Sequence, residues 1–143
     1  MSETNATIGG VDARSDVELR LPADGAFASV LRTLTAGLAA RLDFTMDDIE
    51  DLRIAVSEAV AMVLDEADPG AELVCRFHLE PGELTLECRT TSQRPTKPDY
   101  DSFGWQVLTT LTSAASVEAV PGRYGVRLTV HSSIDPLTDG AGL

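Results

Sequence analysis

The stretch FTMDDIEDLRIAVSEAV, residues 44–60, carries the clearest structural signal in the chain, because it predicts the start and the buried face of a long helix. Thr45 can cap this helix, and Asp48 stands three residues later, which is the spacing of a capping box with Asp in place of Glu. Apolar residues then recur at helical spacing, at Ile49, Leu52, Val56, Val60, Val63 and Ala67. The run Asp68-Pro69-Gly70 ends the pattern, so we expect a helix from about residue 45 to residue 67.

A strand and a helix are predicted on the N-terminal side of this segment. Residues 16–21 alternate between apolar and charged side chains, which predicts an exposed first strand. Asp24 is a candidate N-cap for a helix that we expect to end near Arg41 or Leu42. Positions spaced by three and four predict one apolar face for this helix, made of Phe27, Val30, Leu31, Leu34, Leu38 and Leu42.

A β-hairpin is predicted after the long helix. Apolar residues alternate on both sides of the pair Pro81-Gly82, at Leu73, Cys75, Phe77 and Leu79 and then at Leu84, Leu86 and Cys88. Pro-Gly fits the centre of a type II turn, and a turn there places Cys75 opposite Cys88 on the core face. Two cysteines are too few ligands for a structural zinc site, so we expect free thiols that pack as small apolar side chains.

The C-terminal third predicts a loop, a helix and two strands. Residues 90–98 lack periodicity and contain two prolines, so we expect a mobile loop there. Asp101 or Ser102 can cap a third helix, whose predicted packing residues are Phe103, Val107, Leu108 and Leu111. Strands are predicted at residues 116–120 and 124–131, separated by Pro121-Gly122.

The predicted element order is strand, helix, helix, strand, strand, helix, strand, strand. This order lacks the strict alternation of strand and helix that a parallel sheet requires, so we expect an α+β protein. It predicts a two-layer α/β sandwich, in which helices cover one face of a mainly antiparallel sheet. We place a single domain at residues 16–132, between flexible tails at residues 1–15 and 133–143.

The composition of the chain limits the classes of partner. The 143 residues contain no apolar run as long as a membrane span, and the first 16 lack the apolar run of a signal peptide, so we expect a cytoplasmic protein. The formal net charge of −12 opposes direct binding to nucleic acid. It favours a basic protein surface as target, although solubility alone would also explain it.

Glu58 is the one carboxylate placed among the apolar residues of the long helix. Its neighbours along the helical surface are Ala55, Val56, Ala59 and Met62. Such surroundings raise the pKa of a carboxyl group and suit it to act as a base. The alternative is that Glu58 reaches solvent at the boundary, which periodicity alone favours. His78 and His131 have no nucleophile recognisably placed beside them, and we expect both at the surface.

Residues 44–49 followed by residues 56–60 resemble the opening of the ATP-binding domain of anti-sigma-factor serine kinases. That family belongs to the gyrase, Hsp90, histidine-kinase and MutL type of ATPase, so the resemblance implies a Bergerat-type ATPase fold over about residues 17–130. It also implies that Glu58 is the catalytic base. Met62 stands where the family has the Asn that binds Mg²⁺, and a thioether is a poor ligand for this hard cation.

The other nucleotide-binding motifs of the family are degraded in this chain. Where the family has Asp-x-Gly-x-Gly after its third strand, Thr90 replaces the Asp that reads adenine and Ser92 replaces the first Gly. In the later glycine box, which wraps phosphates, only Gly104 matches. Gly125 resembles the glycine that begins the last strand, although a glycine beside a turn is common in any protein.

Phe103 and Trp105 flank the remaining glycine of that box. We interpret them as side chains that fill the former nucleotide pocket, and Trp105 fits a core position equally well. ATP with Mg²⁺ therefore stays a candidate cofactor pair for weak binding, because contacts of the backbone with phosphate do not need the lost side chains. Efficient phosphoryl transfer is harder to reconcile with the missing metal ligand.

The resemblance also implies protein partners. Arg32 matches the arginine through which the family contacts both the sigma factor and the competing anti-anti-sigma factor. The alternative is an ordinary solvated arginine. Family members commonly form homodimers, for which the first helix and the edge strand at residues 17–21 could supply an interface.

Three functions follow from these expectations. The leading hypothesis is an anti-sigma factor that sequesters an RNA polymerase sigma factor, as in stress-response regulation, and is released by an anti-anti-sigma factor. The second is an active serine protein kinase that phosphorylates its antagonist with ATP and Mg²⁺. The third is a small-molecule-responsive regulatory module.

Overall fold

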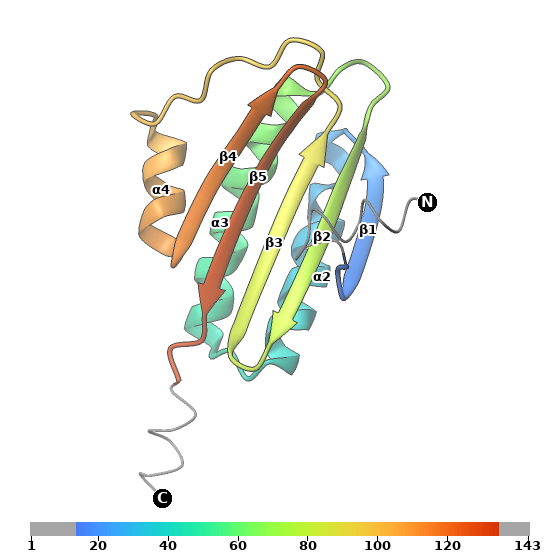
Figure 1. Ribbon diagram of the computed structural model, residues 1–143. Helices are drawn as coiled ribbons and strands as arrows, with labels where there is room; N and C mark the ends of the chain where they lie inside the picture. The colour runs from blue at the N-terminus through green and yellow to red at the C-terminus, as the bar shows by residue number, and fades with distance from the viewer. Residues whose placement is uncertain (1–13, 135–143) are drawn as a thin grey trace, which may run out of the picture.

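The computed structural model describes residues 14–134, so most of the two predicted tails, residues 1–13 and 135–143, lies outside the described part. Within residues 14–134, one five-stranded antiparallel sheet has the order β1-β2-β3-β5-β4. The strands are β1 (Val17–Pro22), β2 (Glu72–Glu80), β3 (Glu83–Thr90), β4 (Ala114–Val120) and β5 (Arg123–His131). The helices are the short 3₁₀ turn η2 (Gly25–Phe27), α2 (Ala28–Arg41), α3 (Met46–Glu66) and α4 (Phe103–Leu111). The helices lie on one side of the sheet, which confirms the predicted two-layer α+β sandwich (Figure 1).

Helix α3 is the central helix of the helical layer, and its predicted capping box is present. The Asp48 N–H donates to the Thr45 hydroxyl at 3.0 Å, and the Thr45 N–H donates to the Asp48 carboxylate at 3.1 Å. Its buried face against the sheet consists of Leu52, Ala55, Val56, Ala59, Val60 and Val63. The predicted helix is thus confirmed in type, start and orientation.

Helix α2 ends at Arg41 as predicted, but it begins only at Ala28, after η2, and it is rotated relative to the predicted apolar face. Asp24 caps the preceding turn η2 by accepting from the Ala26 N–H at 2.9 Å. Phe27 and Val30 are 37% and 45% exposed, so their assignment to the buried face was wrong. The fully buried row is Leu31, Thr35 and Ala39. Thr35 can be buried because its hydroxyl donates to the Leu31 carbonyl at 2.7 Å.

The β2–β3 hairpin has the predicted register. Cys75 lies opposite Cys88, and both thiols are free and completely buried in the core. The neighbouring Cys75 thiol and burial together raise the pKa of Cys88 well above its ordinary value. Gly82 has a φ of 72°, which a Pro-Gly type II turn requires at its second central position.

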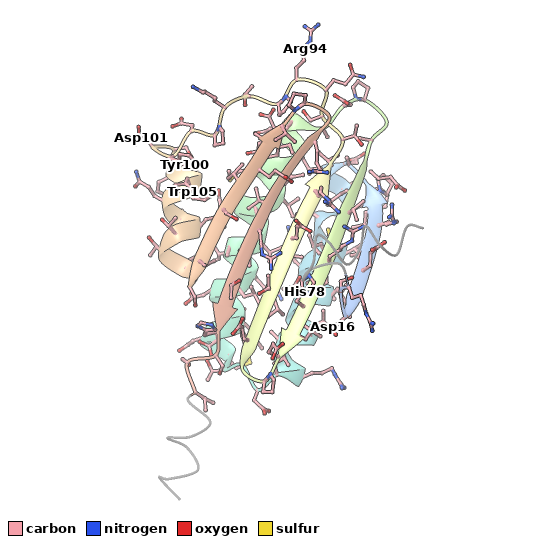
Figure 2. The ribbon with its side chains drawn as sticks, in the orientation of Figure 1. Asp16, His78, Arg94, Tyr100, Asp101 and Trp105 are labelled. Atoms are coloured by element: carbon pink, nitrogen blue, oxygen red, sulfur yellow. The ribbon has the colours of Figure 1, made fainter. Side chains whose placement is uncertain are left out.

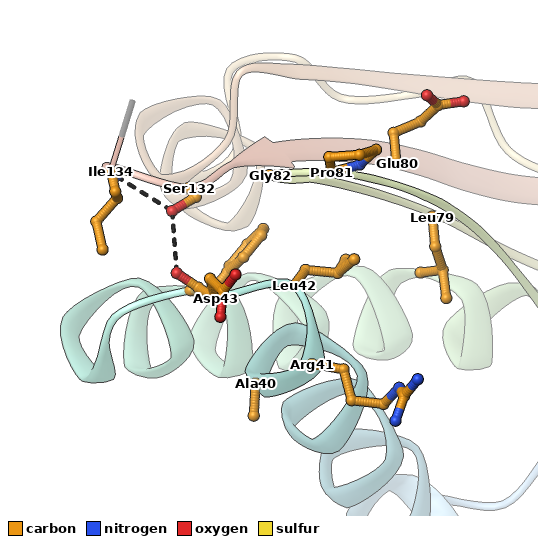
Figure 3. Close-up of a pocket in the computed structure, with 11 residues that line it drawn as sticks. Ala40, Arg41, Leu42, Asp43, Leu79, Glu80, Pro81, Gly82, Ser132 and Ile134 are labelled. Carbon is orange, nitrogen blue, oxygen red and sulfur yellow. Dashed lines mark hydrogen bonds between the residues drawn. The ribbon is translucent and has the colours of Figure 1, made fainter. Parts of the chain in front are cut away.

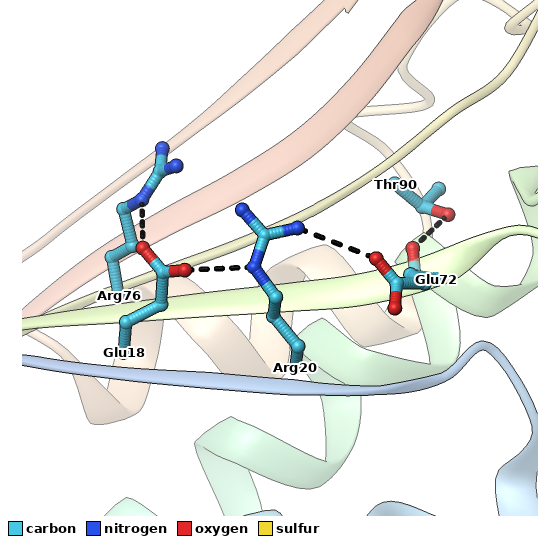
Figure 4. A network of polar contacts seen from close by, with 5 residues as sticks. All are labelled: Glu18, Arg20, Glu72, Arg76 and Thr90. Carbon is cyan, nitrogen blue, oxygen red and sulfur yellow. Dashed lines mark hydrogen bonds and ion pairs between the residues drawn. The ribbon is translucent and has the colours of Figure 1, made fainter.

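The face of the sheet away from the helices is polar. Glu18 on β1 accepts from Arg20 at 2.8 Å and from Arg76 on β2 at 3.0 Å, while Arg20 also pairs with Glu72 (Figure 4). The Arg76 and Arg20 guanidinium groups hold the pKa of Glu18 below its ordinary value. These ion pairs are partly solvated, so each contributes little to stability.

Candidate functional site

The candidate site lies between the middle of α3 and the first turn of α4. Glu58 is half-buried there, and no hydrogen bond joins it to another residue in the range 14–134. A Cβ atom added to Gly104 would lie 2.9 Å from the Glu58 Oε1 atom, so the two residues are in direct contact. The structure therefore brings together the two residues that the family resemblance matched to the base and to the phosphate-binding glycine.

Met62 follows Glu58 by one helical turn and packs against the hydrophobic core. It lies where a metal ligand would be expected, but its thioether is a poor ligand for Mg²⁺. Residues 14–134 contain no cluster of three or more His, Cys, Asp or Glu side chains suited to a metal ion. This side chain therefore does not fit a Mg²⁺ ion bound beside Glu58.

Thr90 and Ser92 lie where β3 ends, and both are buried. The Thr90 hydroxyl donates to the Glu72 carbonyl of the adjacent strand at 2.8 Å. This donor is therefore engaged in a bond within the sheet and is not available to a ligand. The Ser92 carbonyl accepts from the Gly122 N–H at 2.8 Å, which ties this segment to the β4–β5 turn. Neither residue supplies the carboxylate acceptor with which the family reads the adenine amino group.

Gly125 lies apart from these residues. The strand alternation places its neighbours Tyr124 and Val126 in the core, so Gly125 belongs to the opposite, polar face of the sheet. A Cβ atom there would lie 3.1 Å from the Cys88 carbonyl oxygen of β3. Its small size thus serves the packing of the sheet, and it does not join the cluster around Glu58.

The segment that follows β3 is fastened to the C-terminal end of α3. The Gln93 N–H donates to the Asp68 carboxylate at 3.1 Å, and the Asp68 N–H donates to the Thr91 carbonyl at 2.9 Å. The Thr96 N–H and hydroxyl donate to the Glu66 carboxylate at 2.9 and 2.7 Å. The predicted loop is present from residue 91, whereas Thr90 ends β3, and these bonds attach the loop to α3 more firmly than its composition indicated.

A cavity of about 450 Å³ lies under this loop and is strongly acidic. Asp65, Glu66 and Asp68 line it, together with Ser92, Gln93, Arg94 and Thr96. Three carboxylates oppose the binding of a polyphosphate. The role of Glu66 and Asp68 was not predicted from the sequence, although three acidic residues at the end of a helix beside a polar loop were a usable signal.

Aromatic residues gather at the start of α4. Figure 2 shows Tyr100 and Trp105 side by side, with their ring centroids 5.1 Å apart and their planes at 62°. Trp105 is half-buried and packs against the core, whereas Phe103 is 79% exposed. The interpretation that Phe103 fills the former pocket was therefore wrong. The Ser102 hydroxyl accepts from the Trp105 N–H at 3.2 Å, and the helix that begins at this cap leaves the Phe103 side chain in solvent.

Tyr124 is a core residue that sequence analysis did not single out. It lies opposite Thr90 on β5, and burial raises the pKa of its phenol, with the carboxylates of Glu66 and Asp65 adding to the effect. The acidic residues that line the cavity under the loop therefore also influence the pKa of a phenol in the core. The inward alternation of β5 was the available signal for this placement.

A larger cavity, about 800 Å³, lies at the other end of the sandwich, between the α2–α3 connection and the β2–β3 turn (Figure 3). Its apolar wall is made of Ala40, Leu42, Phe44, Leu79, Pro81 and Ile134. Ile134 is held there because its N–H donates to the Ser132 hydroxyl at 3.1 Å. None of the site residues predicted from the sequence lines this cavity.

The remaining candidates are isolated side chains. Arg32 is half-buried on α2 and makes no hydrogen bond or ion pair with the described residues. His131 is exposed, as expected, and its Nε2 lies 3.2 Å from the Glu83 carboxylate. His78 is only half-exposed, and its buried Nε2 has no partner among residues 14–134. No helix in the described range is long and apolar enough to cross a membrane.

Known proteins resemble the chain in sequence and in fold. No model of a known protein family matches it. Over 88 residues it is 45% identical to the serine-protein kinase RsbW of Halalkalibacterium halodurans, an alignment that covers 61% of this chain and 52% of that protein. The chain thus matches about half the length of this curated relative.

Two solved structures share the fold. The RsbU and RsbW domains of Rv1364c from Mycobacterium tuberculosis superpose with a TM-score of 0.62 at 17% identity, over 83% of this chain and 33% of that one. The mycobacterial sensor histidine kinase MprB superposes with a TM-score of 0.52 at 12% identity, over 80% of this chain and 98% of that one. The chain is thus similar in sequence to proteins named serine-protein kinase RsbW, and in fold to a structure that contains an RsbW domain.

Proposed function

We propose that this chain is a cytoplasmic anti-sigma factor that sequesters an RNA polymerase sigma factor and is released by an anti-anti-sigma factor, without phosphorylating it. The observation that carries the proposal is that the nucleotide-binding positions are used for other purposes in an intact domain. Met62 is partly buried and packs against the core, and the Thr90 hydroxyl bonds to the sheet. These residues do not fit Mg²⁺-ATP, so the proposed mechanism includes no chemical step.

Sequestration requires a surface that covers the sigma factor. The outer side of η2 and α2 supports such a role, because Phe27 and Val30 are exposed there and Arg32 has no partner among the described residues. Residues two apart on a helix do not face each other, so Arg32 lies on the other flank of α2 from Val30. A partner that spans α2 could pair a carboxylate with Arg32 and remove Phe27 and Val30 from water. The same side could serve a homodimer, since the edge strand β1 lies on this flank of the sheet.

A second candidate function is the active serine protein kinase. It is favoured by one observation, the direct contact between Glu58 and Gly104 at the start of α4. In this alternative Glu58 would be the general base, and the N-terminus of α4 would face a phosphate. The same contact is compatible with a sequestering protein that has kept the backbone arrangement of an ancestral site.

A third candidate is the small-molecule-responsive module, and the cavity of about 800 Å³ favours it, since its size lies within the range of ligand pockets. It would require a ligand that changes the affinity for the sigma factor. The cavity lies away from Glu58, so substitutions at Phe44 or Leu79 would separate this function from the kinase.

Titration with Mg²⁺-ATP, followed by thermal unfolding and calorimetry, tests the main proposal. A ligand that binds only the folded chain must raise its melting temperature. We expect no metal-dependent rise up to millimolar nucleotide, and stoichiometric inhibition of sigma-dependent transcription in the absence of ATP. Transfer of the γ-phosphate to an anti-anti-sigma factor, abolished in Glu58→Gln, would instead establish the kinase.

A further inference from the structure

The start of α4 presents an aromatic surface that the proposed function does not use. Phe103 and Tyr100 are 79% and 55% exposed, and Trp105 supports Tyr100 through the edge-to-face contact. Large apolar side chains this exposed are unusual on the surface of a soluble domain when they occur together. We call Tyr100, Phe103 and Trp105 the α4 aromatic surface.

The backbone that carries this surface is held in place by local hydrogen bonds. The Ser102 N–H donates to the Asp99 carbonyl at 3.2 Å, and the Ser102 hydroxyl caps α4 at Trp105. The Asp101 N–H donates to the Asp99 carboxylate at 3.0 Å, which closes the turn that carries Tyr100. Binding of a partner would therefore cost little backbone conformational entropy in this chain.

The charges around the surface are mainly negative. Glu58 contacts Gly104 from α3 and has no hydrogen-bond partner in residues 14–134. Asp101 follows Tyr100 in the turn before α4, and its carboxylate has no partner among the described residues either. Between residues 97 and 105, all of which are described, Lys97 is the one cation. A site of this kind opposes the anion that a nucleotide-binding relative would hold and attracts a cation.

We propose that the α4 aromatic surface binds a basic amphipathic segment of a protein partner. An apolar side chain of the segment would cover Phe103, and an arginine or lysine would lie over the Tyr100 ring and pair with Asp101 or Glu58. Aromatic faces and carboxylates both attract such cations, and a desolvated cation–π contact adds to the ion pair. The inference adds a contact surface to the proposed sequestration, and peptide binding tests it separately from any sigma factor.

The experiment uses two synthetic amphipathic helical peptides of equal length and equal leucine content, one carrying Lys and Arg and the other carrying Glu. Calorimetry measures their binding to the full chain. We expect the basic peptide to bind at least about tenfold more tightly than the acidic one, and Phe103→Ser to weaken it about tenfold, as for a central interface residue. Asp101→Asn should weaken it less and reduce its salt dependence.

Met46→Ser is the matched control, because Met46 is 76% exposed at the far end of α3. It should leave the affinity for the basic peptide unchanged. Equal affinity of the wild type and Phe103→Ser would overturn the proposal, since the peptide would then follow only the overall negative charge. Absence of binding, or equal binding of the two peptides, would overturn it as well. If a sigma factor binds the wild type and Phe103→Ser equally, the surface is excluded from that complex while sequestration stands.

Discussion

Asp48 shows how a single carboxylate can connect distant parts of the chain. Besides closing the capping box with Thr45, its Oδ2 accepts from the N–H and from the hydroxyl of Ser133, each at 3.0 Å. Partial burial favours the protonated form, but the bonds from Ser133 and Thr45 outweigh it and hold the pKa of Asp48 below its ordinary value. The start of α3 and the residues after β5 are thereby joined.

Asp48→Ala should lower the free energy of unfolding by about 1–2 kcal/mol at neutral pH, the cost of a lost cap and an unsatisfied donor. Because the pKa is lowered in the folded state, this contribution is present above the pKa of the unfolded carboxyl group. It is lost as the pH falls through the folded pKa. Urea denaturation at neutral and acidic pH measures it, with Asp47→Ala, an exposed carboxylate in the same turn, as the control. A difference that did not shrink in acid would contradict this assignment.

Two glycines that the family resemblance singled out should respond in opposite ways to alanine. At Gly104 the new methyl group meets only the end of the Glu58 side chain, which can swing away, and alanine favours the helix by as much as about 1 kcal/mol. At Gly125 it meets the Cys88 carbonyl in the middle of the sheet, which cannot move freely, so we expect a loss of about 1–3 kcal/mol. Urea denaturation of both variants measures the change in the free energy of unfolding. A larger loss at Gly104 than at Gly125 would mean that Glu58 is held rigidly.

At the scale of elements, the loop after β3 depends on carboxylates from another element. Glu66→Gln should replace the two charge-assisted bonds to Thr96 by weaker neutral ones, so the loop should open more often. We expect about tenfold faster amide hydrogen exchange at Thr96, with exchange in β2 unchanged. Asp65→Asn is the matched control, because Asp65 is exposed one residue earlier on α3. Equal exchange in wild type and Glu66→Gln would show that these bonds do not hold the loop.

The elements themselves could be predicted where the pattern was unambiguous, as in α3 and the β2–β3 hairpin. Helix α2 shows the limit, because its apolar residues spread over more than half its circumference. The rotation was settled by close packing of Leu31, Thr35 and Ala39, and no hydrophobicity pattern would choose a threonine for the core. In the candidate site, sequence matching located Glu58 and Gly104. It could not reveal the bond from Thr90 to Glu72, which depends on strand pairing over 18 positions.

At the scale of the whole molecule, the acidic composition lowers the stability of the folded state through charge repulsion. The formal net charge of −12 on 143 residues means that folding brings many carboxylates closer together. The ion pairs that could offset this repulsion are exposed, as between Arg123 and Glu118 at 3.0 Å, and exposed pairs contribute little. The balance should therefore be net repulsion, with the folded state limited by its charge as well as by its core.

Added salt should for this reason stabilise the chain. Raising NaCl from about 10 to about 300 mM shortens the range of charge interactions several-fold and weakens the many repulsions more than the few attractions. We expect the melting temperature to rise by a few degrees. Replacing two exposed carboxylates of α3, in Glu50→Lys with Asp51→Lys, adds two charges at each position and changes the formal net charge from −12 to −8, so the rise should become smaller. A melting temperature that falls with salt would show that ion pairs such as Arg123–Glu118 outweigh the repulsion. In that case the polar face of the sheet would contribute more to stability than its exposure indicates.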